Sequence, residues 1–260
     1  MLTDIRYQLI FLLMEPEVYK QYACNEDDYW WFKGRRAYLE QVILQYVGQR
    51  NNLKICEVGC GSGGNLTMLA HHGIVDAVEM ESYAQQYALS REITNVSKVL
   101  VGYLPDNIPL VGPYEVVCCF DVIEHVEDDL DAIAALKQLV KPAGGVLVVT
   151  VPAYQWMWSS HDVANQHFRR YTIRRVRYLM ESVGFKVCYS SYFNTLLFPL
   201  AVLSKSLEWI NVKKTKKTEW AVKMPRSWIN NLLQWIFGLE RYWAGKISIP
   251  FGLSIVVVAR

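Results

Sequence analysis

The sequence predicts an α/β domain in which helices cover both faces of a doubly wound parallel sheet. From about residue 53 onward, short apolar runs rich in β-branched residues alternate with segments of helical periodicity. Continuously apolar strands are buried on both faces, which is typical of parallel sheets. The expected strands are residues 53–58, 74–79, 98–101, 114–120, 145–150, 185–189 and 253–259.

The expected helices lie between and before these strands. An apolar stripe through Leu39, Val42 and Ile43 predicts a helix over residues 36–49, with Gly48 suited to its C-terminal cap. Further helices are expected at residues 64–72, 83–92, 126–140 and 173–183.

Composition excludes several classes of protein. The chain of 260 residues is 52% hydrophobic and 20% charged, so it can bury a core and is not disordered. A net charge of +2 is too small for a protein that wraps nucleic acid, and we expect no nucleic-acid partner. The six cysteines favour reduced, buried thiols, and the N-terminus does not resemble a targeting signal. We therefore expect a cytoplasmic protein, either free or held peripherally at the inner face of the membrane.

A glycine-rich segment follows the first expected strand. Residues 57–64 read EVGCGSGG, and glycines at this point let the backbone turn sharply and approach a ligand closely. The following helix offers free N–H groups. Gly59, Gly61 and Gly64 also fit the dinucleotide fingerprint, so the glycine spacing alone does not choose the ligand.

Two carboxylates narrow the choice. Glu79 lies twenty residues after Gly59, at the end of the second expected strand, and suits two ribose hydroxyls with either ligand. Glu57 is unfavourable beside an anionic pyrophosphate, but it suits a ligand with an amino group and a sulfonium. S-adenosylmethionine is such a ligand.

The chain resembles the class I S-adenosylmethionine-dependent methyltransferases, a group that includes ubiquinone-pathway O-methyltransferases and the type 11–12 methyltransferase domains. Glu57-x-Gly59-x-Gly61-x-Gly63 resembles their motif I, and residues 120–126 (FDVIEHV) and 136–145 (LKQLVKPAGG) resemble two later segments. The resemblance covers about residues 50–190 and the last strand. It implies a Rossmann-like seven-stranded sheet, mostly parallel, whose last strand lies antiparallel beside the sixth.

The resemblance also implies a domain organisation. Residues 1–50 are expected to form an N-terminal helical cap or lid, and residues 51–190 with 250–260 the cofactor-binding domain. Residues 191–249 then form a helical insertion before the last strand, with five of the nine tryptophans. A separate C-terminal domain is the alternative, although it leaves the last strand without a partner.

The cofactor site follows by the same resemblance. Glu57 is expected to face the methionine amino group, Glu79 the ribose hydroxyls, and the loop at Leu104 the adenine. Tyr103 stands where relatives often have Asp, which leaves open a side-chain bond to the adenine amine. The expected cofactor-binding residues are Glu57, Gly59, Cys60, Gly61, Gly63, Glu79, Met80, Leu104, Phe120, Asp121, Trp30 and Arg35.

Histidines and arginines follow the fourth and fifth strands, where a methyl acceptor would bind. The candidate catalytic residues are His125, His167, His161 and Arg170. They suit a proton acceptor and an acidic or phosphate-bearing substrate. The alternatives are a helix-cap histidine at 125, salt bridges for the arginines, and simple packing for Trp30, Trp31, Arg35 and Arg36.

No metal site is predicted, although one segment leaves the question open. Asp121-x-x-Glu124-His125 resembles the Glu-x-x-Glu-His metal site of ubiquinone-pathway O-methyltransferases. Oxygen and imidazole ligands suit a divalent ion, but similar segments occur in relatives without metal.

The insertion carries an apolar helical face beside a lysine cluster. This face is formed by Trp228, Ile229, Leu232, Leu233, Trp235, Ile236, Leu239 and Trp243. Opposite it lie Asn230, Asn231, Gln234 and Arg241. With Lys213, Lys214, Lys216, Lys217 and Lys223, such a face suits an interfacial helix that holds a lipidic substrate or touches an anionic membrane. The alternative is a lid, or a homodimer face, packed on protein.

We expect a methyltransferase that transfers a methyl group from S-adenosylmethionine to an oxygen or nitrogen nucleophile of a small or lipid-linked acceptor. One alternative is an NAD(P)-dependent oxidoreductase. Another is a catalytically inactive S-adenosylmethionine-binding protein that docks a partner through residues 191–249.

Overall fold

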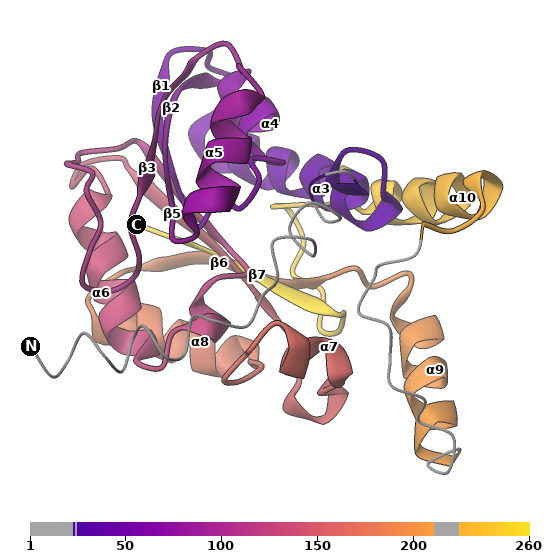
Figure 1. Ribbon diagram of the computed structural model, residues 1–260. Helices are drawn as coiled ribbons and strands as arrows, with labels where there is room; N and C mark the ends of the chain where they lie inside the picture. The colour runs from indigo at the N-terminus through magenta and orange to yellow at the C-terminus, as the bar shows by residue number, and fades with distance from the viewer. Residues whose placement is uncertain (1–22, 24, 211–223) are drawn as a thin grey trace, which may run out of the picture.

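The computed structural model describes residue 23, residues 25–210 and residues 224–260, with side chains of helix α9 up to residue 207. Seven strands form one sheet in the order β3-β2-β1-β4-β5-β7-β6 (Figure 1). β7 runs antiparallel to both of its neighbours, β5 and β6, and the other pairs are parallel. The strands are β1 Leu53–Val58, β2 Gly73–Glu79, β3 Val96–Val101, β4 Val116–Phe120, β5 Val146–Pro152, β6 Val187–Phe193 and β7 Ser254–Ala259. The predicted Rossmann-like sheet with its antiparallel last strand is confirmed.

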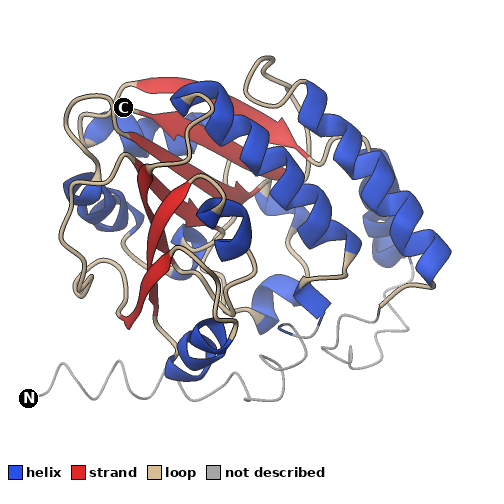
Figure 2. Ribbon diagram, turned by 90° about the horizontal axis from the view of Figure 1, so that it is seen from above, coloured by secondary structure: helices blue, strands red, loops and turns tan. Residues whose placement is uncertain are grey.

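Helices cover both faces of this sheet (Figures 1 and 2). The α-helices are α3 Trp30–Val47, α4 Leu66–Ala70, α5 Ser82–Ser90, α6 Asp129–Leu139, α7 Ser160–Ala164, α8 Ile173–Ser182, α9 Phe198–Ile210 and α10 Ser227–Gly238. Three 3₁₀ helices are η1 Ile123–His125, η2 Gln155–Met157 and η4 Leu239–Tyr242. α3 begins six residues before the predicted start and ends at Gly48, whose φ of 75° and N–H bond to the Leu44 carbonyl confirm the expected cap.

Alternation along the strands divides the core into two layers. Ile55 and Val148 point toward the cluster that contains side chains of α3, α4 and α10. Val58 and Val149 point toward the cluster that contains α6 and α8. Because β1, β2, β4 and β5 run parallel, their carboxyl ends and the loops that follow them meet at one edge of the sheet.

β6 lies further along the chain than predicted, over residues 187–193 rather than 185–189. Pairing with β7 extends it as far as Phe193, through two serines that the apolar pattern did not favour. Ser191 is nevertheless fully buried, because its hydroxyl donates to the Tyr192 carbonyl and accepts from the Ile249 N–H. In the same strand Cys188 is exposed, which corrects the expected burial of that thiol. Four other thiols, Cys56, Cys60, Cys118 and Cys119, are free and buried as expected, and Cys24 lies outside the described residues.

α10 packs along α3 (Figure 2), through Leu233 and Ile236 of the expected apolar face together with Asn230 and Phe237. The Phe237 ring is fully buried over Gly34, where a Cβ atom would lie 2.5 Å from the ring. The Asn230 side chain, expected opposite the apolar face, is buried, and it accepts from the Trp30 backbone N–H and donates to the Asp28 carbonyl. Trp228 and Trp235, which the sequence placed on the same apolar face, are 65% and 62% exposed. The Phe237–Gly34 contact sets the rotation of the helix.

α9 projects away from the body of the molecule (Figure 1). The segment that leads into α9 is held by the buried carboxylate of Glu240 in η4. This carboxylate accepts from the backbone N–H groups of Asn194, Thr195 and Leu196 at 2.6–2.9 Å. Among the described helices, none has the length and apolar character needed to cross a bilayer.

Candidate active site

The glycine-rich loop leaves β1 at the carboxyl edge of the sheet. Gly59, Gly61 and Gly63 all have positive φ angles, of 79°, 55° and 86°. A Cβ atom on Gly59 would lie 2.3 Å from a methyl group of Val122, so the turn can pass only without a side chain. The loop therefore exposes backbone rather than side chains to a ligand.

Glu79 braces this loop from the end of β2. Its carboxylate accepts from the Gly61 N–H at 2.7 Å and from the Glu81 N–H at 3.0 Å. Burial raises the pKa of Glu79, and these backbone hydrogen bonds oppose the rise. Each carboxylate oxygen has a second lone pair, so Glu79 can hold the loop and still accept from ligand hydroxyls.

Glu57 is fully buried beneath the loop. Its Oε1 accepts from the Asn65 side-chain amide at 2.8 Å, whereas its Oε2 meets no hydrogen-bond partner in the described part of the chain. Burial raises the pKa of Glu57 to about 8, against the lowering effect of Asn65. A buried carboxylate with one free oxygen is suited to a cationic ligand group. Asn65 was missed from the sequence, where it appeared only as part of a helix start.

α3 reaches the same edge through Arg35. The buried guanidinium donates to Asp121 at the end of β4 and to the Thr150 hydroxyl in β5. It also lies over the rings of Trp31 and Phe120, at 5.1 and 5.4 Å from their centroids. Arg35, Phe120 and Asp121 are thus brought together, as expected of three cofactor-site candidates.

Glu26 lies directly on the glycine loop and was missed from the sequence. Its carboxylate is hydrogen-bonded to the Ser62 hydroxyl and ion-paired with Arg91 at 3.4 Å. A Cβ atom on Gly64 would lie only 2.0 Å from the Glu26 carboxylate carbon. The segment before α3 therefore contacts the loop through Glu26, whereas Trp30 is placed toward α10, with its ring edge-on to Phe237.

The remaining cofactor candidates line the same side of the sheet. Cys60 is buried within the glycine loop, and Leu104 is buried beyond β3. Met80 and Tyr103, after β2 and β3, are each 39% exposed. The Gly102 N–H donates to the Glu79 carbonyl, which ties these two loops together.

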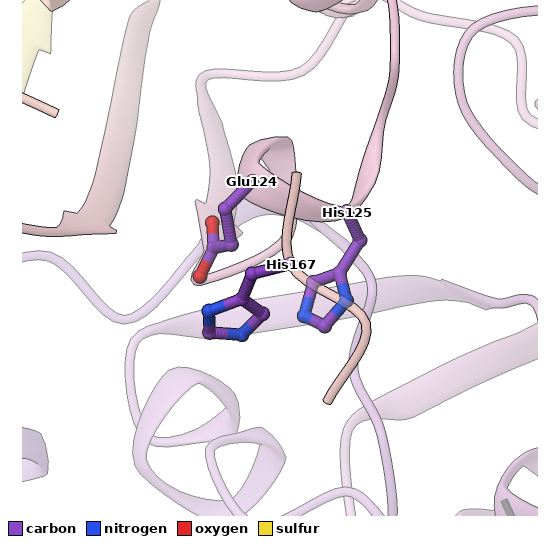
Figure 3. A group of neighbouring side chains, drawn as sticks. All are labelled: Glu124, His125 and His167. Carbon is purple, nitrogen blue, oxygen red and sulfur yellow. The ribbon is translucent and has the colours of Figure 1, made fainter. Parts of the chain in front are cut away.

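A second group of side chains lies after β4 and β5. Glu124, His125 and His167 place ligand atoms within 4.8 Å of one another, with the first two on η1 (Figure 3). Glu124 is fully buried, and both of its carboxylate oxygens lack hydrogen-bond partners among the described residues. Burial and the nearby Asp121 carboxylate raise the pKa of Glu124 well above its usual value. His125 keeps an exposed edge, and burial of the rest of its ring together with His167 lowers its pKa.

His167 is held by a carboxylate. Its Nδ1 lies 2.9 Å from the buried Asp162, which also accepts from Arg170 at 2.7 and 2.8 Å. Burial raises the pKa of Asp162, but the hydrogen bonds from His167 and Arg170 outweigh this and hold it well below its usual range. The Asp162 contact uses one ring nitrogen of His167 and leaves Nε2 for other partners.

The other candidates on this side are engaged in pairs. Arg170 is committed to Asp162, and Arg169 lies 3.3 Å from Asp129, as the salt-bridge interpretation expected. His161 is exposed, with its Nε2 3.1 Å from the Asn165 amide. Of the three residues in the possible metal segment, Asp121 is instead hydrogen-bonded to Arg35 and Thr150. His167 lies beside Glu124 and His125 in its place.

A Rossmann-like sheet with a glycine loop, two acidic residues at strand ends and an antiparallel last strand defines the class I methyltransferase fold. Residues 31–190 match a protein family described as "Methyltransferase domain". The chain belongs to this methyltransferase family.

Curated relatives and solved structures agree with this assignment. The chain is 34% identical over 116 residues to a ubiquinone biosynthesis O-methyltransferase of Leptothrix cholodnii, covering 42% of this chain and 48% of that protein. It is 30% identical over 143 residues to the Pectobacterium carotovorum protein of the same name, covering 49% of this chain and 59% of that protein. The matches thus span about half the length of these relatives.

Two solved structures show the same fold. A putative methyltransferase from Bacillus halodurans has a TM-score of 0.55 at 17% identity, covering 84% of this chain and 96% of the other. Phosphoethanolamine N-methyltransferase 2 of Haemonchus contortus, solved with S-adenosyl-L-methionine, has a TM-score of 0.55 at 14% identity, covering 84% of this chain and 50% of the other.

Proposed function

We propose that this chain is an S-adenosylmethionine-dependent methyltransferase acting on an oxygen or nitrogen nucleophile of a small or lipid-linked acceptor. The observation that carries the proposal is the free, buried Oε2 of Glu57 beneath the glycine loop. A cationic amino group would satisfy this oxygen, whereas an anionic pyrophosphate would not. The ubiquinone biosynthesis names of the curated relatives support an oxygen nucleophile and a lipid-tailed acceptor.

The cofactor residues divide into three roles. Glu57 would pair with the methionine ammonium, and Glu79 would accept from the ribose hydroxyls while holding the loop. The Arg35–Asp121 ion pair holds α3 against the end of β4, beside the proposed cofactor site. Bound S-adenosylmethionine supplies an electrophilic methyl group, and the protein has to align the acceptor with it in a dry pocket.

On the acceptor side, His167 is our candidate general base. Asp162 holds the Nδ1 side of the ring, so that Nε2 can accept a proton from the acceptor hydroxyl or amine. The same carboxylate would stabilise the imidazolium that results.

The two free oxygens of buried Glu124 support a second role for this group. A carboxylate and two imidazoles suit a divalent ion. Asp162 would then orient the His167 ring through its hydrogen bond without contacting the ion itself. An ion there would polarise the acceptor oxygen, with His167 as ligand instead of base.

Titration with Mg²⁺, Mn²⁺ and Zn²⁺ by calorimetry distinguishes these roles. If His125 and His167 hold an ion with Glu124, wild-type protein binds it and Glu124→Gln does not, because the amide removes the anionic ligand. Exposed Asp131→Asn is the matched control and should bind as wild type. If no ion binds to wild type, the metal role is rejected and His167 remains the candidate base.

Ligand titration tests the proposed function itself. Wild-type protein should bind S-adenosylhomocysteine and not NADH, whereas NADH binding alone would favour the oxidoreductase. Glu79→Ala should weaken S-adenosylhomocysteine binding by about 1–3 kcal/mol, because it strips an acceptor from ligand hydroxyls. Glu115→Ala, which removes a carboxylate near the start of β4, should have no effect. Turnover with small quinol and catechol acceptors then separates an enzyme from an inactive binding protein that docks a partner through residues 191–249.

A further inference from the structure

α9 presents a leucine stripe to the outside of the molecule. Leu196 lies in the turn just before the helix, and Leu200, Leu203 and Leu207 follow within it at intervals of three and four residues, along one side. Their exposed fractions are 43%, 59%, 57% and 51%. A continuous apolar face of this kind on a projecting helix marks an interaction surface.

Aromatic side chains extend this surface at the base of α9. The Phe198 ring lies 5.8 Å from the rings of Tyr154 and Phe251 and 6.3 Å from that of Trp156, measured between centroids. Trp156 and Phe251 remain 45% and 44% exposed. Tryptophan beside an aliphatic face is characteristic of the boundary between apolar and polar phases of a membrane.

The charge of the sequence around the stripe favours an anionic partner. Residues 196–207 contain no acidic residue, and the next sixteen residues contain five lysines and two glutamates. Protein interfaces are depleted of lysine, whereas basic residues flanking an apolar helical face suit anionic lipid headgroups. With 13 residues, α9 is about 20 Å long, too short to cross a bilayer but long enough to lie in its surface.

We propose that the leucine stripe of α9 docks the protein on a membrane surface that contains anionic lipids. Phe198, at the start of α9, lies beside Tyr154, whose N–H donates to the Tyr171 carbonyl next to Arg170. Docking therefore sets the acceptor side of the site close to the membrane. This last consequence rests on the proposed methyltransferase function and would bring a lipid-linked acceptor to His167, whereas the docking itself does not depend on catalysis.

Flotation with vesicles tests the proposal. Full-length wild type should bind vesicles of phosphatidylcholine and phosphatidylglycerol, bind pure phosphatidylcholine much more weakly, and lose binding as salt concentration rises. The triple variant Leu200→Ser, Leu203→Ser, Leu207→Ser should lose affinity for the anionic vesicles by at least about tenfold, because it removes three apolar side chains from the stripe.

A second triple variant provides the control. Ile74→Ser, Leu89→Ser and Val111→Ser change exposed apolar residues outside the stripe (57%, 49% and 85% exposed) and should leave vesicle affinity unchanged. Thermal unfolding and S-adenosylhomocysteine binding confirm that each variant is folded. A failure of wild type to float, or equal flotation of wild type and the stripe variant, overturns the proposal. A dimer in lipid-free solution that the stripe variant converts to monomer also overturns it, since a second copy then covers the stripe.

Discussion

Glu57 shows how a single buried carboxylate connects stability with ligand binding. Removing this group from water is unfavourable, and Asn65 compensates at only one of its two oxygens. The raised pKa of about 8 means that the ligand-free protein holds this side chain largely protonated at neutral pH. A bound ammonium would favour the ionised form, so the site is prepared for a cation at the expense of stability.

Glu57→Gln should therefore stabilise the ligand-free protein at alkaline pH. Because folding raises the pKa of Glu57 from 4.5 to about 8, its contribution to stability is fully present below about pH 4.5 and is lost as the pH rises to about 8. Glutamine does not titrate, so the variant should exceed wild type at pH 8 by about 1–3 kcal/mol and bind S-adenosylhomocysteine more weakly. Urea unfolding at acidic and alkaline pH measures the difference. A stability difference that is independent of pH would contradict this account.

Asp162→Asn should separate turnover from cofactor binding. The variant removes the charge that holds His167 and Arg170, so activity should fall while S-adenosylhomocysteine affinity stays near wild type. Near neutral pH it should lose about 1–3 kcal/mol of stability. Because folding lowers the pKa of Asp162 below 3.8, the wild-type advantage is present above that value and is lost as the pH falls further.

The pH profile of turnover checks the role of Asp162. If Asp162 positions the base, the variant's acidic limb shifts as well as its maximum rate, which a purely structural defect does not produce. Asp131→Asn, an exposed acid on α6, is the control and should change neither quantity.

At the scale of elements, the contact between α3 and α10 decides which side of α10 is buried. The stripe through Asn230, Leu233 and Phe237 faces the protein, at intervals of three and four residues. The apolar face expected from the sequence shares Leu233 with this stripe, but it also included Trp228 and Trp235, which are exposed, and it left out Asn230 and Phe237. The sequence could not show that Gly34 leaves a space for Phe237, since the two lie about two hundred residues apart in the chain.

A double-mutant cycle tests this contact. Gly34→Ala alone should destabilise the fold by about 1–3 kcal/mol, because the new methyl group meets the Phe237 ring. Phe237→Ala alone should cost about 3–5 kcal/mol by leaving a cavity. In the Phe237→Ala background, Gly34→Ala should become neutral or stabilise by up to about 1 kcal/mol, because alanine favours the helix more than glycine. Additive effects in urea unfolding would show that the two residues do not interact.

At the scale of the whole molecule, the cofactor site connects distant parts of the chain. Glu26, before α3, contacts the glycine loop after β1, and Arg35, in α3, contacts Asp121 after β4. Residues on three separate segments therefore depend on one another for their positions. Ligand binding at the loop should therefore stabilise residues 25–36 as well as the sheet.

Cofactor binding should accordingly stabilise the whole domain. S-adenosylhomocysteine at one hundred times its dissociation constant should add about 2.7 kcal/mol to the free energy of unfolding, and NADH should add nothing. Hydrogen exchange should slow in residues 57–64 and also in residues 25–36, because Glu26 contacts Ser62 and Gly64 of the loop. Slower exchange confined to the loop would contradict the proposed coupling.

The sequence by itself determined the succession of the seven strands and of most helices along the chain, the glycine loop and the acidic residues at its edge. These features depend on local periodicity and on chain segments that are close in sequence or meet at one sheet edge, as Glu57 and Glu79 do. Only the tertiary structure decided which distant side chains meet: Glu26 with Ser62, Glu124 with His167, and Phe237 over Gly34. Such contacts depend on how each helix is rotated and how each loop folds over the sheet. Packing between segments far apart in the chain sets both, and the local pattern of either segment does not indicate its partner.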